Sequence, residues 1–307
     1  MRSILVCTGS LRPGYSKPLE SISPGGPPVR LGVVFDRDLP PESLPSFAAE
    51  LDGTTVSDLW VVEDLGWTGA ISSAATALAA TSRLRVGIGI TPAPLRNPML
   101  LAMELANLAR LHPGRLAAGI GHGVQAWMRQ VGAAAASPLS LLEETITSVR
   151  ALLRGETVTL HGREVGLDGV RLVHPPAEPP PVLAGVVNPR SLALSGRVAQ
   201  GTILPEGFTP ERLRSMIEGI GATGDHEVVA FVHLYVGDDA RAALRKAAEE
   251  QAGFLQVAPE EVVMAAGSPE EAATLVRAMW EAGVSTVAVR PVGADPLSHV
   301  HKLLSAL

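Results

Sequence analysis

The chain has 307 residues, a formal net charge of −6 and 46% hydrophobic residues. This length and apolar content suit one large α/β domain or two small ones. The mild acidity and the lack of a polybasic run exclude a basic surface for nucleic acid. The single cysteine, Cys7, excludes an internal disulfide framework and fits a reducing cytoplasm.

The N-terminal region is expected to lie outside the fold. Residues 8–29 are rich in Gly, Pro and Ser and lack periodicity, so residues 1–29 are predicted to form a loosely ordered arm before a single domain over residues 30–307. Cys7 has no recognisable thiol motif and is interpreted as incidental. No apolar run approaches the roughly 18 residues of a membrane-spanning helix, and the start is too short for a signal-peptide core. We expect a cytoplasmic protein without a membrane partner.

Strands and helices alternate along the rest of the chain. The predicted strands cover residues 31–35, 57–63, 84–90, 115–121, 181–187, 201–204, 228–236 and 285–291. The predicted helices cover residues 44–51, 70–82, 99–111, 138–153, 190–198, 210–219, 238–251, 268–282 and 296–306. Expected helix caps are Ser137, Asp238 or Asp239, and Ser268, the last with Glu271 in a capping box. A β-rich excursion is expected over residues 155–173.

This alternation favours an α/β fold of the (β/α)8 barrel type with a β-rich insertion. About eight strands alternate with helices over roughly 280 residues, and no polar linker separates two halves. A doubly wound sheet is the alternative. That fold would place a glycine-rich fingerprint directly after the first strand, where residues 35–38 read FDRD instead.

The central stretch, residues 83–123, has small residues on one side of two strands. Apolar Leu84, Val86, Ile88 and Ile90 alternate with Arg85, Gly87 and Gly89, and residues 115–121 repeat the pattern with Gly119 and Gly121. The helix between them implies parallel neighbours. We predict that these glycines line the inner side of the sheet, leaving room for a flat ligand, while the large residues pack on helices.

Polar residues follow the predicted strands, where a barrel carries its function. These residues are Asp36, Glu63, Asp64, Thr91, His122, Asn188 and Glu206. At least one of Glu63 and Asp64 is expected at the barrel mouth, and the other could equally cap a helix. Flanking glycines imply that the backbone at His122 approaches something closely, although a structural histidine is the equal alternative.

Other kinds of site have little support in the sequence. No HxH follows the first strand and no HExxH occurs, so no metal is predicted. His299 and His301 lie in a predicted helix, where neighbours two apart point away from each other. No GxSxG indicates a serine nucleophile. GIGHG, residues 119–123, is a weak signal for phosphate or close backbone approach.

Four segments together resemble the luciferase-like flavin-dependent oxidoreductases, over most of residues 30–293. They are WVVEDLGW (60–67), RLRVGIGITPAPLRNP (83–98), GRLAAGIGHG (114–123) and PVLAGVVNPRSLALSGRVAQGTIL (181–204). Their order and spacing are more specific than any one of them. The resemblance implies a (β/α)8 barrel with insertions. Within the family the chain is most similar to the actinobacterial branch that uses the 8-hydroxy-5-deazaflavin coenzyme F-420.

The resemblance also assigns site residues. It implies a cis peptide bond between Gly89 and Ile90 that supports one face of the ring system, with Thr91 and residues 121–125 holding the ring. The implied catalytic residues are His122, which matches the acid after the fourth strand, and Asp64. The implied cofactor contacts are Gly89, Ile90, Thr91, Gly121, Gln125, Gly185, Val186, Val187 and Asn188.

Two departures from the family pattern bear on these assignments. Leu65 stands where the family has a histidine after Asp64, which removes a histidine catalyst from that position. The usual Gly-Gly of the phosphate loop is Val187-Asn188, which puts the phosphate contacts in doubt.

Three functions follow from this reading. The first is hydride transfer between coenzyme F-420 and a small organic substrate, with His122 exchanging a proton. The second is a monooxygenase that uses reduced FMN and oxygen. The third is a non-catalytic protein that binds a flavin or deazaflavin. The expected partner is a small-molecule substrate; a homodimer is left open, and nothing in the sequence names the substrate.

Overall fold

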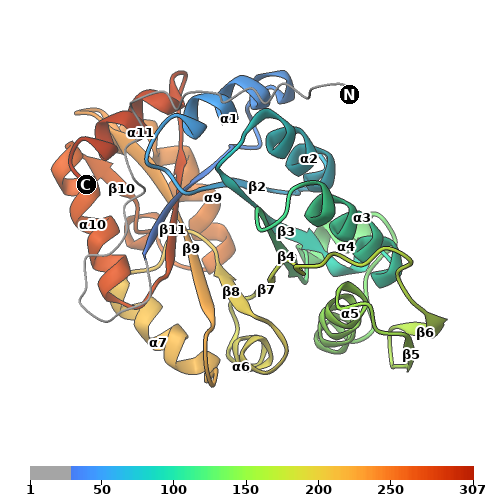
Figure 1. The fold of residues 1–307 in the computed structure, drawn as a ribbon. Helices are drawn as coiled ribbons and strands as arrows, with labels where there is room; N and C mark the ends of the chain where they lie inside the picture. The colour runs from blue at the N-terminus through green and yellow to red at the C-terminus, as the bar shows by residue number, and fades with distance from the viewer. Residues whose placement is uncertain (1–28) are drawn as a thin grey trace, which may run out of the picture.

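A computed structural model describes residues 29–307, and the predicted arm and Cys7 lie outside this range except for residue 29. Eight parallel strands form a closed barrel (Figure 1). They are β1 (Arg30–Val34), β2 (Asp58–Val61), β3 (Arg85–Pro92), β4 (Leu116–Gly121), β7 (Val182–Gly185), β8 (Gly201–Leu204), β9 (Glu227–Val236) and β11 (Thr286–Pro291). β8 pairs with both β7 and β9, which closes the ring and confirms the predicted barrel over the doubly wound sheet.

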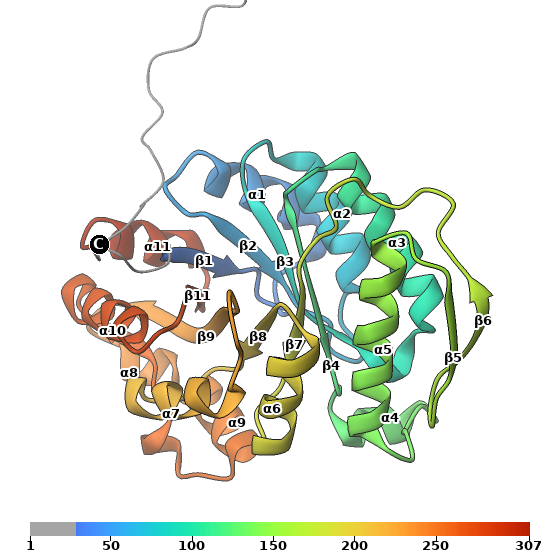
Figure 2. The same ribbon diagram turned by 60° about the horizontal axis from the view of Figure 1, so that its bottom comes forward.

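Helices surround the barrel (Figure 2). The outer helices are α1 (Leu44–Asp52), α2 (Ala70–Ala80), α3 (Pro98–Leu111), α5 (Pro138–Leu153), α6 (Pro189–Val198), α7 (Pro210–Ile220), α10 (Pro269–Glu281) and α11 (Pro296–Leu304). Their apolar faces pack on the outward side chains of the strands and form the larger core. Of the helices in residues 29–307, none is long and apolar enough to cross a membrane.

The expected β-rich excursion is a two-stranded antiparallel hairpin. It consists of β5 (Val158–His161) and β6 (Gly166–Val170). Glu144 of α5 anchors its turn by accepting hydrogen bonds from the amides of Arg163, Glu164 and Val165 at 2.8–2.9 Å. The capping box of α10 is present as predicted. Ser137 precedes α5 without capping it, because its hydroxyl pairs with the Ser140 hydroxyl at 2.8 Å.

The sequence pattern does not predict the short elements of the structure. The strand β10 (Ala265–Gly267) joins the edge of β9, and α4 (Gln125–Gln130) follows β4. The helix predicted over residues 238–251 is two helices, α8 (Ala240–Ala243) and α9 (Arg245–Leu255), and Asp239 makes no side-chain cap. Single-turn helices and three-residue strands show too few periods for a hydrophobic pattern to reveal them.

The small residues of β3 and β4 face the barrel interior, as predicted, but the space beside them is filled. A Cβ on Gly87 would lie 2.3 Å from the Trp60 ring, and one on Gly89 would lie 2.6 Å from Phe231. Trp60 is fully buried within a separate inner cluster that includes Phe231. The interior at this depth is therefore packed, and room for a ligand begins above it.

One face assignment in β3 is wrong. The alternation in the sequence predicts Ile90 on the outer face with Ile88, yet Ile90 packs against the inner cluster. The register between β3 and β4 shifts between Ile88 and Thr91, and the Gly89–Ile90 peptide bond within this shift is cis, as the resemblance implies. The irregularity breaks the two-residue alternation, so Gly89 and Ile90 both lie on the inner side.

Candidate active site

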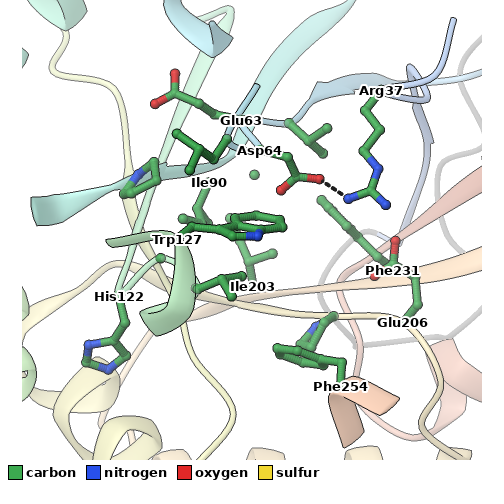
Figure 3. Close-up of a pocket in the computed structure, with 18 of the residues that line it drawn as sticks. Arg37, Glu63, Asp64, Ile90, His122, Trp127, Ile203, Glu206, Phe231 and Phe254 are labelled. Atoms are coloured by element: carbon green, nitrogen blue, oxygen red, sulfur yellow. Dashed lines mark hydrogen bonds and ion pairs between the residues drawn. The ribbon is translucent and has the colours of Figure 1, made fainter. Parts of the chain in front are cut away.

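A cavity of about 1530 Å³ opens at the C-terminal ends of the strands (Figure 3). Its wall is formed by the strand ends and the loops after them, by α4, by the start of α6 and by α9. Sites for one small molecule usually enclose about 300–1,000 Å³. The volume is therefore sufficient for a cofactor together with a second molecule.

Most of the residues implied by the resemblance meet in this cavity. Those that line it are Asp64, Gly89, Ile90, His122, Gln125, Gly185, Val186, Val187 and Asn188. Thr91 and Gly121 do not line it. The shift in β3 leaves Thr91 buried with 1% of its surface exposed, and Gly121 lies beneath Ile90, whose side chain is 2.9 Å from where a Cβ would sit. Neither can contact a ligand with a side chain from within this cavity.

The start of α6 has free hydrogen-bond donors. The amides of Val187, Asn188, Arg190 and Ser191 donate to no acceptor among the residues that the structure describes. Pro189 occupies the first helical position and has no amide hydrogen. The exposed Arg190 forms no ion pair with any residue of the described range. Free amides, a helix N-terminus and a cation make this end of the cavity suited to an anion such as phosphate.

His122 lies beside the start of α6. Its Nε2 is 3.0 Å from the Ser191 hydroxyl, and its Nδ1 is buried without a hydrogen-bond partner among the described residues. Figure 3 shows the ring turned away from Trp127. Burial lowers the pKa of His122, so the imidazole is neutral at pH 7. Its position in the cavity is established, and its catalytic role stays a prediction.

The adjacent carboxylates after β2 have different tasks, as the sequence suggested. Glu63 accepts a hydrogen bond from the Ala70 amide at 2.8 Å, at the start of α2, and forms a two-point ion pair with Arg96. Asp64 instead pairs with Arg37 at 2.6 Å at the cavity wall (Figure 3). Both carboxylates line the cavity and each is held by a cation, but only Glu63 also stabilises the start of a helix.

A buried polar cluster faces the cavity opposite α6, and sequence reasoning found only its carboxylates. Arg290 of β11 lies 2.7 Å from Asp36 and 3.3 Å from Glu206. His233 of β9 stands opposite Arg290 in the parallel register. The sequence offers a signal for His233, a histidine within an otherwise apolar strand. Asp36 and Arg290 are 254 positions apart, so no local pattern could join them.

Aromatic rings cover the middle of the cavity. Trp127 of α4, Phe231 of β9 and Phe254 of α9 line it, and Figure 3 shows Trp127 near Ile90. Trp67 lies under the Arg37 guanidinium, 4.4 Å from its centre, and donates to Asp38 at 3.0 Å. The cavity thus has an anion-binding end at α6, an apolar middle and a carboxylate-rich end at His233. Within residues 29–307, no group of three His, Cys, Asp or Glu side chains is arranged to hold a metal ion.

The sequence matches one family model, described as luciferase-like monooxygenase, over residues 31–293. Among curated proteins, the chain is 24% identical over 176 residues to a 5,10-methylenetetrahydromethanopterin reductase from Methanolobus tindarius, covering 57% of this chain and 54% of that protein. It is 30% identical over 152 residues to an F-420-dependent glucose-6-phosphate dehydrogenase from Nakamurella multipartita, covering 48% and 42%. The matched part thus spans about half the length of these relatives.

The fold also matches solved structures. An F-420-dependent secondary alcohol dehydrogenase, solved with an F-420–acetone adduct, superimposes with a TM-score of 0.78 at 20% identity. The match covers 91% of this chain and 98% of that one. At this identity the likeness shows a shared fold, and a shared substrate does not follow from it.

Proposed function

Because the chain belongs to the luciferase-like monooxygenase family, we propose that it is an oxidoreductase that transfers a hydride between coenzyme F-420 and a small organic substrate. Two kinds of observation support this. Curated relatives at 24–30% identity include enzymes named for this coenzyme, and the cavity combines a place for an anionic tail with an apolar space for a ring.

The start of α6 carries the proposal. Four amides without acceptors in the described range, together with Arg190, would hold the phosphate of the coenzyme tail. This observation supports the phosphate contacts despite the departure at Val187-Asn188, because backbone amides rather than side chains would hold the phosphate. Ile90, turned inward by the register shift, would support one face of the ring. When bound, the coenzyme supplies a two-electron carrier that reacts poorly with oxygen.

His122 is the proposed proton-exchanging group. It lines the cavity, and its buried neutral imidazole can accept a proton at neutral pH. Leu65 leaves the end of β2 without a histidine, and Asp64 is paired with Arg37, so neither competes for this role. We therefore assign to His122, at the end of β4, the proton that the coenzyme ring exchanges when it accepts or gives up the hydride, and not the proton of the substrate oxygen.

The alternative cofactor is reduced FMN, for an oxygen-dependent monooxygenase, because the family description names that activity. The two tricyclic rings have the same framework except at one ring atom, where the deazaflavin has carbon and FMN has N5, and they differ further in their substituents, so the apolar middle has room for either. Fluorescence quenching with each oxidised cofactor distinguishes them. We expect coenzyme F-420 to bind at least about tenfold more tightly than FMN, a difference of about 1.4 kcal/mol. Binding of FMN alone would contradict the proposal.

A non-catalytic role predicts a different result. A cofactor-binding protein without activity would bind coenzyme F-420 tightly. None of the alcohols, sugars or aldehydes tested would then reduce the bound coenzyme. We expect turnover instead, measured as the loss of the oxidised coenzyme's visible absorbance. Tight binding with no turnover over a broad substrate panel would overturn the enzyme assignment and leave the binding assignment intact.

A further inference from the structure

The wall of the cavity around His233 carries more negative than positive charge. Five carboxylates line this end: Asp36, Asp38, Asp64, Glu206 and Glu250. Three cations accompany them: Arg37, Lys246 and Arg290. The formal charge of these eight side chains is therefore −2. The α6 end, in contrast, has Arg190 without an ion pair among the described residues. An anion approaching the His233 end meets repulsion rather than attraction.

Each of these three cations already has a carboxylate partner. Arg290 lies between Asp36 and Glu206, at 2.7 and 3.3 Å. Arg37 lies between Asp64 and Glu250, at 2.6 and 3.1 Å. Lys246 is 3.7 Å from Glu250. A phosphate or carboxylate on a substrate would have to displace an existing partner, and one of the two partners of Arg290, Glu206, is buried.

The two carboxylates beside Arg290 stay ionised. Burial works against ionisation of Asp36, but Arg290 lowers its pKa below the ordinary value. Burial likewise opposes ionisation of Glu206, while the Arg290 guanidinium lowers its pKa. The negative charge at this end is therefore present throughout the neutral pH range.

His233 is the polar group here that has no partner. Its side chain lines the cavity with 6% of the residue exposed, and its Nδ1 is buried without a hydrogen-bond partner in the described part of the chain. Burial lowers the pKa of His233, with Glu206 opposing, so the ring is neutral. A neutral imidazole has one N–H donor and one acceptor nitrogen, which suits both a carbonyl and a hydroxyl. Because Nδ1 is enclosed by protein, Nε2, which makes no hydrogen bond within the described residues either, is the ring nitrogen that a ligand in the cavity would contact.

The surroundings of His233 are apolar apart from this cluster. Phe231 lies two residues earlier on the same strand and so faces the same side, and it lines the cavity with Phe254 and Trp127. Figure 3 shows Phe254 and Phe231 on the same side of the cavity as Glu206. These rings would contact the hydrocarbon part of a bound molecule.

We propose that the His233 end of the cavity selects an uncharged hydroxyl or carbonyl compound with an apolar body, whose oxygen hydrogen-bonds His233, and rejects phosphorylated and carboxylate substrates. This rests on the proposed function, which assigns the α6 end to the coenzyme. His233 and the paired cations are then the residues that determine whether a charged or an uncharged substrate binds. Glucose 6-phosphate, the substrate named for one relative, is among the compounds that this chain excludes.

The test compares two ketones of similar shape and different charge. Acetophenone and 4-acetylbenzoate are titrated into the chain loaded with oxidised coenzyme F-420, with tryptophan fluorescence from Trp67 and Trp127 as the readout. Neither ketone reacts with the oxidised coenzyme, so binding is measured apart from turnover. We expect acetophenone to bind at least about tenfold more tightly than 4-acetylbenzoate.

Two variants separate the contributions. His233→Asn should weaken acetophenone about tenfold and leave coenzyme affinity within about twofold. His226→Asn, just before the same strand at the other end of the barrel, is the matched control and should change neither. Asp36→Asn removes one negative charge and one partner of Arg290, so it should strengthen 4-acetylbenzoate several-fold. This gain of affinity stays measurable even if the His233 variant fails to fold.

The outcomes are distinct. Equal or tighter binding of 4-acetylbenzoate or glucose 6-phosphate by the unaltered chain overturns the inference, as does the absence of acetophenone binding at millimolar concentration. Repeating the titration without coenzyme shows which claim fails. If the coenzyme does not bind and acetophenone is still preferred, the proposed function fails and the charge selection stands.

Discussion

At the N-terminal ends of the strands, Arg85 lies between Asp58 and Glu227, and at the C-terminal ends Arg290 lies between Asp36 and Glu206. Both are arginines between two carboxylates in the wall of one barrel. At the N-terminal end, Arg30 and Thr286 also donate to Glu227, and no side-chain nitrogen or oxygen of this network is buried without a partner among the described residues.

At the C-terminal end the hydrogen bonding is incomplete. The Nδ1 atoms of His122 and His233 and the Nε of Arg37 are buried there without partners within residues 29–307. Native proteins pair nearly all buried polar atoms. Unpaired atoms also occur away from this end, at Trp60, Thr145, Ser148 and Arg150, so what marks His122, His233 and Arg37 is that their side chains line the cavity. The N-terminal end of the barrel therefore carries a complete ion-pair network, whereas the C-terminal end carries the cavity and the candidate site.

The largest effect is expected at the cavity, for His122→Ala. If His122 exchanges a proton during turnover, the rate should fall by about 10²–10⁴-fold, while thermal stability and coenzyme affinity change little. Single-turnover kinetics beside a thermal melt measures both. His112→Ala, on the turn between α3 and β4 at the opposite end, is the control. A normal rate with a lowered melting temperature would give His122 a structural role.

At the N-terminal end of the barrel, called the closed end below, Arg85→Met is expected to lower stability and leave the site intact. Removing this guanidinium leaves Asp58 and Glu227 buried and facing each other, so the free energy of unfolding should fall by about 3–5 kcal/mol. Coenzyme affinity of the folded variant should be unchanged. Arg245→Met, in an exposed pair with Glu249, should cost less than about 0.5 kcal/mol. Urea unfolding measures both; similar losses for the two variants would contradict the comparison.

Acid should act on the same network. Burial opposes the ionisation of Glu227, yet Arg85 and Arg30 lower the pKa of this carboxyl group from 4.5 to about 2. A group with a lowered folded-state pKa stabilises the fold above its unfolded pKa, and this stability is lost as the pH falls through the folded value. Unfolding free energy should therefore decline from about pH 4.5 toward 2. In Glu227→Gln that part of the decline should be absent; an unaltered profile would contradict the assignment.

A smaller effect is expected where the packed interior meets the cavity. In Gly89→Val the new Cβ would lie 2.6 Å from Phe231, and the branched side chain would push that ring toward the cavity. Coenzyme affinity should fall by more than about tenfold, or about 1.4 kcal/mol. Gly219→Val on α7, where a Cβ meets its first neighbour at 3.9 Å, is the control for adding a β-branched residue. Unchanged affinity in Gly89→Val would show that this edge of the cavity is not in contact with the ring.

The structure of the closed end was more predictable from the sequence than that of the C-terminal end, called the open end, which carries the cavity. Hydrophobic alternation identified the eight barrel strands and their inward glycines because that signal is local. The face of Ile90 was missed because one register shift reverses the alternation after Ile88. Arg290, His233 and Arg37 were missed because their partners lie on other strand ends or on α9, and only barrel closure brings them together. The free amides of α6 depend on backbone conformation, which side-chain patterns do not report.

Hydrogen–deuterium exchange with and without oxidised coenzyme F-420 tests most directly whether the open end is the cofactor site. Bound coenzyme should slow exchange at the amides of Val187, Asn188, Arg190 and Ser191, which have no acceptor in the described part of the chain. Exchange at the strand starts around Arg30, Asp58, Arg85 and Glu227 should stay the same. Protection at those strand starts, or none at residues 187–191, would contradict the assignment of the two ends.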